Sequence, residues 1–483
     1  MAWSSKKVCV VGAGVSGLVS ARELRREGHD VTVMEQSGGV GGQWLYDPRT
    51  DASDPLGVAG AHSSVYASLR LNTPRESMGF SDYPFVYPAG NDDDGAGGDA
   101  RRYPGHAEFL RYIRRFCDAF GLMDAVRLNT KVLHVAPSAP RGHGDGSVTR
   151  WTVRCSSRHG DCDGEAVTTE ETTFDAVVVA VGQFTQPRLP VINGMDKWSR
   201  RQLHSHSYRV PDSFQDEAVV VVGCHASGVD IALELRAVAR DVHVSVKSVD
   251  DGVAVSPGMR KAASRHHNLH LHPQIERLCE DGQVTFADGS RVVADSIVYC
   301  TGYGYSFPFL DTGGLVTVDD GSRVGPLYEH TFPPALAPSL SFVGVPKRVV
   351  VPRFYETQAR WVAEVLSGRR ALPSSEEMMR AAEGYHHPAR EMMVAGVPKH
   401  LAHDIFDDYD YCDEFGEKHC GFPRLERWKK ELRWSSIARQ RGEGEGEGED
   451  SESFRDVYRD SDLVREGLQA QGWPWPAGSH QHK

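Results

Sequence analysis

Long apolar segments and paired cysteines are both missing from this 483-residue sequence. Its nine cysteines are scattered, and none stands in a CxxC pair or at the spacing of metal ligands. This pattern is typical of a chain kept in a reducing compartment, and it excludes a redox-active cysteine pair. No run of apolar residues reaches the roughly 18 that a membrane-spanning helix needs. A predicted strand follows Met1 so closely that we expect no signal or transit peptide, and hence a cytoplasmic protein.

A basic surface is missing as well. The formal net charge is -12 and the cationic residues form no stripe, which argues against nucleic acid as a partner. The rest of the composition is ordinary for a globular protein, with 40% hydrophobic residues in a chain long enough for two or three domains.

Two stretches of the chain share one pattern of strand, glycine-rich turn and amphipathic helix. The first begins at Val8 and the second at Val219, and they superimpose without a gap when 211 is added to each residue number. The superposition places Gly12 on Gly223, Gly14 on His225, Ser16 on Ser227 and Gly17 on Gly228. A single GxGxxG is weak evidence, but a whole strand–loop–helix–strand unit that occurs twice predicts two nucleotide-binding folds.

The two units differ where the second strand of each ends. In the first unit that strand ends on Glu35, whose carboxylate can accept hydrogen bonds from ribose hydroxyls. At the matching position the second unit has Val246, followed by Lys247 and Ser248, which suits the 2′-phosphate of NADPH. We therefore assign FAD to the first unit and NADPH to the second; an ordinary charged strand end and a solvated lysine are the alternative interpretation. His225, in place of the middle glycine, leaves less room for a pyrophosphate.

The order of the strands predicts how the two units are joined. Residues 175–182 and 295–303 read as buried parallel strands that bracket the second unit. We therefore predict an α/β fold with two dinucleotide-binding (Rossmann-like) domains, in which the NADPH domain is inserted in the FAD domain. The predicted parts are 1–185 and 305–437 for the FAD domain, 186–304 for the NADPH domain with its linker, and 438–483 for a flexible acidic linker and tail.

Further segments have simpler interpretations. Helices are expected over 107–122, 355–366 and much of 376–437, and a buried strand over 339–344. The stretches 90–102, 137–149 and 441–450 are rich in glycine and polar residues and are expected to be solvated. Four histidines lie close together, but at this spacing they are more often surface imidazoles than ligands, so we predict no metal site at His266, His267, His270 and His272.

A longer motif stands just before the second glycine loop. The signature F-x-G-x-x-x-H-x-x-x-Y/F is matched in spacing by Trp198, Arg200, His204 and Tyr208, with the histidine and the terminal aromatic kept. Other motifs follow in family order, namely GGxW at 41–44, NTPRE at 72–76, GxxxSG at 223–228, TGY at 301–303, ETQARW at 356–361 and CGFP at 420–423. With these motifs, residues 5–435 resemble the flavin-containing monooxygenases, and specifically their plant S-oxygenating, glucosinolate S-oxygenase-like branch.

This resemblance implies the chemistry and the roles of single residues. NADPH would reduce FAD by hydride transfer, O2 would add at flavin C4a to form a hydroperoxyflavin, and a thioether sulfur would take one oxygen atom to become a sulfoxide. Asn72 matches the asparagine beside C4a and is the predicted catalytic residue, with capping of the loop before Pro74 as the alternative. The predicted cofactor-binding residues are Gly12, Gly14, Ser16, Gly17, Glu35, Gly42, Gln43, Trp44, His204, Tyr208, Gly223, Ser227, Gly228, Lys247, Thr301, Gly302 and Gln358.

Other interpretations stay open. N-oxygenation of an amine and a decarboxylating or Baeyer–Villiger-type oxygenation use the same scaffold, although the Baeyer–Villiger signature carries tryptophan where this chain has Tyr208. A flavin disulfide reductase has the same layout but needs the cysteine pair that is missing. A non-catalytic nucleotide-binding protein would also have the two loops. The expected partners are O2 and a small thioether or amine; a homodimer stays open, and the sequence does not define the substrate.

Overall fold

The computed structural model describes residues 5–59, 63–87, 98–138, 150–159, 166–247, 249, 255–384, 403–405, 407–441, 453–456 and 458–473. Most of the three stretches expected to be solvated lies outside the described residues, as does Ser248.

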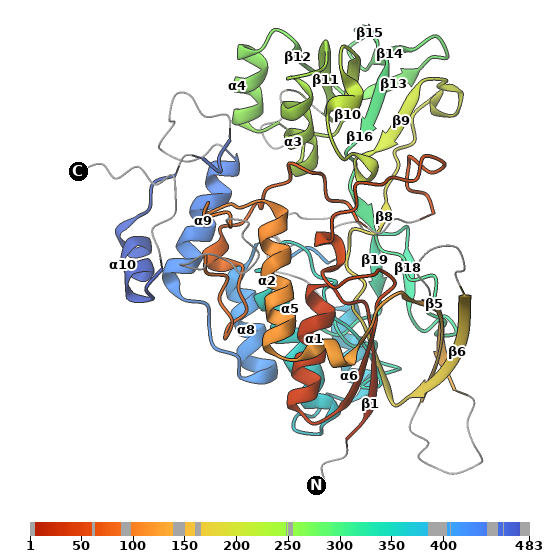
Figure 1. The fold of residues 1–483 in the computed structure, drawn as a ribbon, viewed down its shortest axis with the longest axis vertical. Helices are drawn as coiled ribbons and strands as arrows, with labels where there is room; N and C mark the ends of the chain where they lie inside the picture. The colour runs from red at the N-terminus through yellow and green to blue at the C-terminus, as the bar shows by residue number, and fades with distance from the viewer. Residues whose placement is uncertain are drawn as a thin grey trace.

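Two parallel five-stranded sheets organise the molecule (Figure 1). The first sheet has the order β20 (Leu340–Phe342), β7 (Ala176–Val179), β1 (Lys7–Val11), β2 (Asp30–Met34) and β3 (Val126–Arg127). The second has the order β12 (Leu269–His272), β11 (Asp241–Ser245), β10 (Ala218–Val222), β16 (Ser296–Tyr299) and β9 (Arg201–His204). The predicted α/β fold with two parallel sheets is confirmed.

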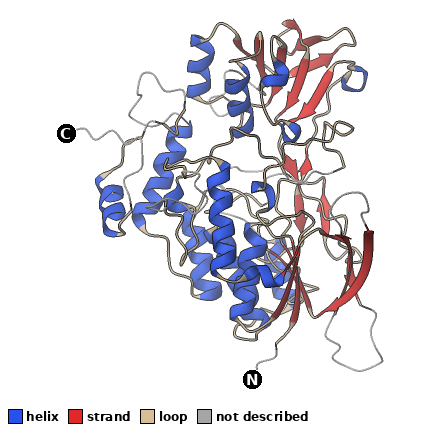
Figure 2. Cartoon of the chain, in the orientation of Figure 1, coloured by secondary structure: helices blue, strands red, loops and turns tan. Residues whose placement is uncertain are grey.

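Each parallel sheet lies between a layer of helices and a small antiparallel sheet (Figure 2). The small sheets are β4 (Thr130–Pro137), β5 (Trp151–His159) and β6 (Ala166–Phe174) in the first case, and β13 (Ile275–Leu278), β14 (Gln283–Phe286) and β15 (Arg291–Val293) in the second. Because side chains alternate along a strand, Val8 and Val10 pack with the helices while Cys9 and Val11 pack with β4–β6. The strands therefore need apolar residues on both faces.

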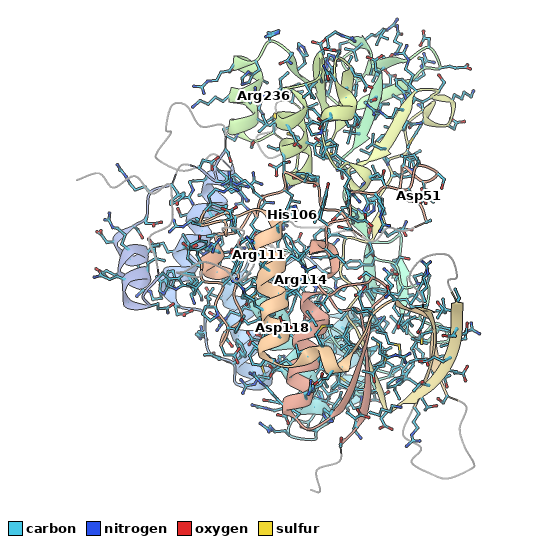
Figure 3. All side chains as sticks on the ribbon, viewed as in Figure 1. Asp51, His106, Arg111, Arg114, Asp118 and Arg236 are labelled. Atoms are coloured by element: carbon cyan, nitrogen blue, oxygen red, sulfur yellow. The ribbon has the colours of Figure 1, made fainter. Side chains whose placement is uncertain are left out.

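The helices complete the two layers. The first sheet is covered by α1 (Val15–Arg26), α2 (His106–Ala119) and α5 (Arg353–Leu366), and the second by α3 (Ala226–Leu235) and α4 (Pro257–Arg265). Arg236 and Asp118, labelled in Figure 3, mark the ends of α3 and α2 and lie in the two different layers. The expected helices at 107–122 and 355–366 and the expected strand at 339–344 are present, with ends shifted by a few residues.

The second sheet is an insertion in the first. All five of its strands come between β7 and β20, which are neighbours in the first sheet. The chain crosses between the domains twice, and the two crossings pair with each other as the antiparallel strands β8 (Gln186–Pro187) and β17 (Tyr303–Gly304). The strands of the second sheet fall within the predicted range 186–304; the exact domain boundaries stay a prediction.

The C-terminal part of the chain packs more closely than expected. After α6 (Ser375–Glu383) come α8 (Tyr409–Cys420), α9 (Arg427–Arg441) and α10 (Asp462–Ala470). Helix α10 buries Val464 and Leu468 against Trp428 and Leu432 of α9. Because these apolar contacts hold residues 462–470 in place, the expectation of a loosely held tail is wrong for this part of it.

A buried ionic network joins α1 to α5. Arg22, which is 2% exposed, donates to Glu356 at 2.6 Å and to Asp82 at 2.8 Å. Glu356 also accepts from the Ser81 hydroxyl at 2.7 Å and the Ser81 backbone N–H at 2.8 Å. The first residue of the ETQARW motif therefore ties together three segments that are far apart in the sequence.

We expect Glu356→Gln to destabilise the protein, because it removes the carboxylate that makes the shortest ion pair with the buried Arg22 guanidinium, while Asp82 and Glu23 remain as its partners. Removing one member of a buried ion pair costs about 3–5 kcal/mol. Urea unfolding followed by circular dichroism should show a midpoint well below that of the wild type. The matched control is Glu417→Gln, since Glu417 pairs with Arg424 at 2.7 Å but both side chains are about half exposed. Equal midpoints for the two variants would contradict the prediction.

Candidate functional site

The first glycine loop is shaped by two close contacts. Gly12 has a φ of +102°, and a Cβ at this position would lie 2.7 Å from the Ala180 carbonyl oxygen. A Cβ at Gly17 would lie 1.8 Å from the Gly12 carbonyl oxygen. Only glycine fits at either position, so the first turn of α1 comes directly onto the end of β1. The unpaired N–H groups of that turn form a cradle for an anionic group such as a pyrophosphate.

Glu35 lies against this cradle. Its carboxylate accepts hydrogen bonds from the backbone N–H groups of Ala13 and Ser37, both at 2.8 Å, and from the Ser37 hydroxyl at 2.7 Å. The side chain is buried at the end of β2. A carboxylate held beside the loop in this way can accept hydrogen bonds from a ribose, as the sequence predicts.

The second glycine loop repeats the first. Gly223 has a φ of +103°, and its Cβ would lie 2.6 Å from the Cys300 carbonyl oxygen. The Cβ of Gly228 would lie 2.0 Å from the Gly223 carbonyl oxygen. His225, in place of the middle glycine, has the same extended backbone as Gly14, with ψ of -171° and -170° respectively. Histidine is therefore compatible with the backbone of the loop.

The side chains that follow β2 in the first unit and β11 in the second differ in chemical character. Val246 is 4% exposed and packs in the apolar core of the second domain, whereas Glu35 turns a carboxylate toward its loop. Lys247, the next residue, is exposed. Among the described residues that follow β11 directly, the second unit therefore presents a cation, Lys247.

The GGxW segment lies beside the first loop. It forms the short helix η1 (Gly42–Trp44), and a Cβ on Gly42 would lie 2.9 Å from the Gly14 Cα. The Trp44 ring packs edge-on against Phe109 with centroids 4.8 Å apart. The Gln43 backbone oxygen accepts from the Ser63 hydroxyl at 3.0 Å. Gly42 therefore lies against the first glycine loop, and Trp44 packs on α2; their role in binding a cofactor stays a prediction.

The signature residues lie in the linker and in the core of the second domain. His204 is fully buried, and this burial, together with the nearby His206, lowers its pKa to about 4. Its Nδ1 accepts from the His206 N–H at 3.1 Å, which identifies Nδ1 as the unprotonated nitrogen. The Tyr208 hydroxyl donates to Glu234 of α3 at 2.7 Å, and burial raises its pKa. His204 therefore makes its hydrogen bond within the linker, and Tyr208 joins the linker to α3.

The two degenerate signature positions are structural as well. Trp198 is buried in the core between the second sheet and β13–β15. The Arg200 guanidinium donates to the backbone oxygens of Ala294 at 2.7 Å and Asp281 at 2.8 Å. Arginine in place of the family's glycine therefore anchors the hairpin beside β9.

The remaining predicted cofactor residues hold loops at the sheet ends. Thr301 donates from its hydroxyl to the Arg188 backbone oxygen, and the Gly302 oxygen accepts from the Arg188 N–H at 2.8 Å. Gln358 is fully buried; it accepts from the Gly344 N–H at 3.1 Å and donates to Thr331 at 2.9 Å. The amide of Gln358 therefore positions the loop after β20, which lies beside Ser16 of the first unit.

Asn72 is exposed and is held by the C-terminal segment. Its side-chain oxygen accepts a hydrogen bond from Arg455, and its backbone oxygen accepts from Gln440 at 3.1 Å. Within the described part of the chain its side chain makes no bond to the loop before Pro74, which leaves the capping alternative without support. The sequence carried no signal for Arg455, because it lies 383 positions from Asn72 and outside every motif.

Thiol and metal chemistry find no support among the described residues. The described cysteines are free, and burial raises the pKa of Cys224 to about 11 and that of Cys300 to about 12. Where the structure describes the chain, no group of three or more His, Cys, Asp or Glu side chains is arranged to hold a metal ion. Likewise, none of the described helices is long and apolar enough to cross a membrane.

Comparison with known proteins identifies relatives along the whole chain. A family model described as flavin-binding monooxygenase-like matches residues 5–254 and 266–425. The chain is 50% identical over 468 residues to the flavin-containing monooxygenase FMO GS-OX-like 8 of Arabidopsis thaliana, covering 96% of this chain and 95% of the relative. It is 48% identical to FMO GS-OX-like 9 of the same plant over 96% of both chains.

Solved structures agree with this result. The S-allyl-L-cysteine S-oxygenase from Allium sativum superimposes with a TM-score of 0.83 at 41% identity, covering 98% of this chain and all of the other. Tmm from Pelagibacter sp. strain HTCC7211 shares the fold, with a TM-score of 0.71 at 21% identity over 95% of this chain and 94% of the other. The predicted enzyme class and, for the family, its cofactor pair of FAD and NADPH are confirmed. This chain belongs to the flavin-binding monooxygenase-like family and is a flavin-containing monooxygenase of the plant GS-OX-like, S-oxygenase branch.

Proposed function

We propose that this protein holds FAD in the first glycine loop and NADPH in the second, and oxygenates a thioether to a sulfoxide. The observation that carries the assignment is the pair of equivalent cradles with opposite side-chain chemistry at the strand ends. Glu35 accepts from the Ala13 N–H at 2.8 Å beside the first loop, whereas Lys247 stands exposed beside the second. A carboxylate suits a free ribose and repels a 2′-phosphate, and an ammonium group attracts one.

The chain's own residues bind and orient the cofactors. The glycine contacts at the starts of α1 and α3 leave helix N-termini that would hold the pyrophosphates, and Gly42 lies against the first loop. The flavin, when bound and reduced, would supply the chemistry that activates O2. The exposed amide of Asn72 would offer an N–H donor to the oxygen-reactive edge of the flavin. Since the sulfur of a thioether is itself the nucleophile, no acid–base pair is needed to activate it.

The substrate class is proposed from the relatives. The Allium sativum protein at 41% identity is described as an S-allyl-L-cysteine S-oxygenase, so thioethers come first. The test is a panel of thioethers and amines incubated with NADPH and O2, with product masses measured. Thioethers should gain one oxygen atom with equal consumption of NADPH. Oxygenation of amines alone, with no thioether gaining an oxygen atom, would refute the proposal.

Alanine substitutions in the two loops should separate the two cofactors. In Gly17→Ala the new Cβ would lie 1.8 Å from the Gly12 oxygen, so we expect loss of bound FAD and of the yellow colour. In Gly228→Ala the Cβ would lie 2.0 Å from the Gly223 oxygen, so the protein should keep FAD but lose NADPH binding. Absorbance at 450 nm, about the usual flavin maximum, and anaerobic bleaching by NADPH measure the two effects. The control is Gly258→Ala, whose Cβ would meet no atom closer than 4.0 Å. The reverse pattern would exchange the assignments.

Lys247→Glu should change the choice of nicotinamide nucleotide. Replacing a cation by an anion next to a 2′-phosphate should raise the KM for NADPH by at least about tenfold, and that for NADH much less. Steady-state kinetics with both nucleotides measure this ratio. Lys197→Glu makes the same charge change on η4 (Met195–Lys197), a different element, and should leave the ratio unchanged. Equal effects of Lys247→Glu on NADPH and NADH would disprove the role of Lys247.

Asn72→Ala should uncouple NADPH oxidation from oxygenation of the substrate. Without the amide donor, the oxygen activated at the flavin should leave more often as hydrogen peroxide, while flavin content and reduction by NADPH persist. The measurement is the amount of hydrogen peroxide and of sulfoxide formed per NADPH. An unchanged ratio would remove Asn72 from the site.

A further inference from the structure

Arg455 is buried between the two domains. Its side chain is 9% exposed, and its guanidinium group donates to four acceptors. These are the Leu71 backbone oxygen at 3.1 Å, the Asn72 side-chain oxygen, and both carboxylate oxygens of Asp230, at 3.0 Å and 2.8 Å. One side chain from the C-terminal segment therefore contacts both the predicted catalytic residue and the inserted domain.

The contact with Arg455 fixes the direction of the Asn72 amide. A guanidinium group has only N–H donors, so the atom of Asn72 that faces Arg455 must be its oxygen. The NH2 group then points away from Arg455, and in the described part of the chain no hydrogen bond occupies it. Because Asn72 is exposed, this NH2 group is available as a donor to a bound cofactor.

The other end of the contact lies on α3. Asp230 is two residues after Gly228, in the helix that begins at the second glycine loop. Its carboxylate is bound side-on by Arg455 and also accepts from the Tyr66 hydroxyl at 2.9 Å. A bidentate Arg–carboxylate pair fixes the relative orientation of the two side chains as well as the distance between them. The same guanidinium group therefore relates the position of Asn72 to that of the second nucleotide loop.

The backbone around Arg455 is itself anchored. Asp456 pairs with Arg70 at 2.7 Å, and Asp460 binds the buried Arg102 at 2.6 Å and 2.8 Å. The Tyr103 ring contacts Phe454 edge-on at 5.7 Å. Arg455 is therefore presented by an ordered segment, so its contacts define a single geometry.

We propose that Arg455 is a positioning residue for the oxygenation reaction: it orients the Asn72 amide with its NH2 group toward the flavin and holds α3 at a fixed place beside it. This role rests on the proposed function of Asn72. It assigns a purpose in the reaction to a C-terminal segment that lies outside the family-model match at residues 5–254 and 266–425.

The first test needs no catalysis. Arg455→Met, Asp230→Asn and the double variant form a thermodynamic cycle on the flavin-free protein, read as thermal unfolding midpoints. The double variant should be no less stable than the worse single variant, because both changes remove the same contact. Additive losses would show that the two side chains do not act together and would overturn the inter-domain part of the proposal.

The second test asks whether Arg455 orients the Asn72 amide. Arg455→Lys keeps the positive charge but replaces the planar guanidinium by a single ammonium group. The lysine can therefore no longer donate hydrogen bonds to Asp230 and Asn72 at the same time. We expect normal FAD content, with the ratio of sulfoxide to hydrogen peroxide lowered about tenfold, the effect of losing one charge-assisted hydrogen bond. Arg455→Lys combined with Asn72→Ala should be no more uncoupled than Asn72→Ala alone.

The matched control is Asp462→Asn, which removes an exposed ion pair with Arg465 on α10 and leaves Arg455 and its anchors in place. Its ratio of sulfoxide to peroxide should equal that of the wild type. Uncoupling by Asp462→Asn to the same extent as by Arg455→Lys would show that general packing is responsible and would overturn the proposal. A wild-type protein that fails to oxidise NADPH would refute the proposed function. An active wild type with unchanged coupling in Arg455→Lys would refute only the positioning role.

Discussion

The approach of a helix onto the end of a strand, without room for a single Cβ atom, is the constraint on which both domains depend. It occurs twice, at Gly17 over Gly12 and at Gly228 over Gly223, with hypothetical Cβ–oxygen distances of 1.8 Å and 2.0 Å. Because the helix starts so close to the strand, its unpaired N–H groups and its positive end converge on one point. An anionic group is stabilised there whatever the rest of the ligand is. The identity of the ligand must therefore be set by other residues.

The residues that distinguish the two units follow the second strand of each, β2 in the first and β11 in the second. In the first unit the loop N–H of Ala13 donates to Glu35, so the carboxylate is held against the loop. In the second unit the matching side chain, Val246, belongs to the apolar core, and the next residue, Lys247, is exposed. The two units thus present charges of opposite sign near the ends of their second strands, on Glu35 and on Lys247, one residue after the matched position.

Much of the site could be predicted because its determinants are local in sequence. Each glycine loop lies in the same strand–loop–helix–strand unit as the residue at the end of its second strand, Glu35 in the first unit and Lys247 in the second, and within such a unit spacing alone defines much of the geometry. Gln358 was predicted to bind a cofactor, and in the structure its amide binds Gly344 and Thr331. Matching a motif identifies such a residue but does not say which atoms its side chain contacts. Arg455 could not be found, since its partners Asn72 and Asp230 lie 383 and 225 positions away. The residues after 450 were expected to be loosely held because their sequence is mostly polar. The apolar residues that hold α10, Val464 and Leu468, are few in this sequence.

The family signature gains a physical meaning from the burial of its polar atoms. His204 is neutral at physiological pH because burial lowers its pKa to about 4, and its Nδ1 is bound within the linker. Tyr208 reaches Glu234 on α3, and Arg455 reaches Asp230 one turn earlier on the same helix. Asp230 and Glu234 are four residues apart and share one face of α3, so this face is bonded to the C-terminal segment and to the linker. Hydride transfer between two nucleotides bound in separate domains requires a fixed arrangement of the domains. The distance between the reacting atoms depends on the position of both domains and not on either one alone.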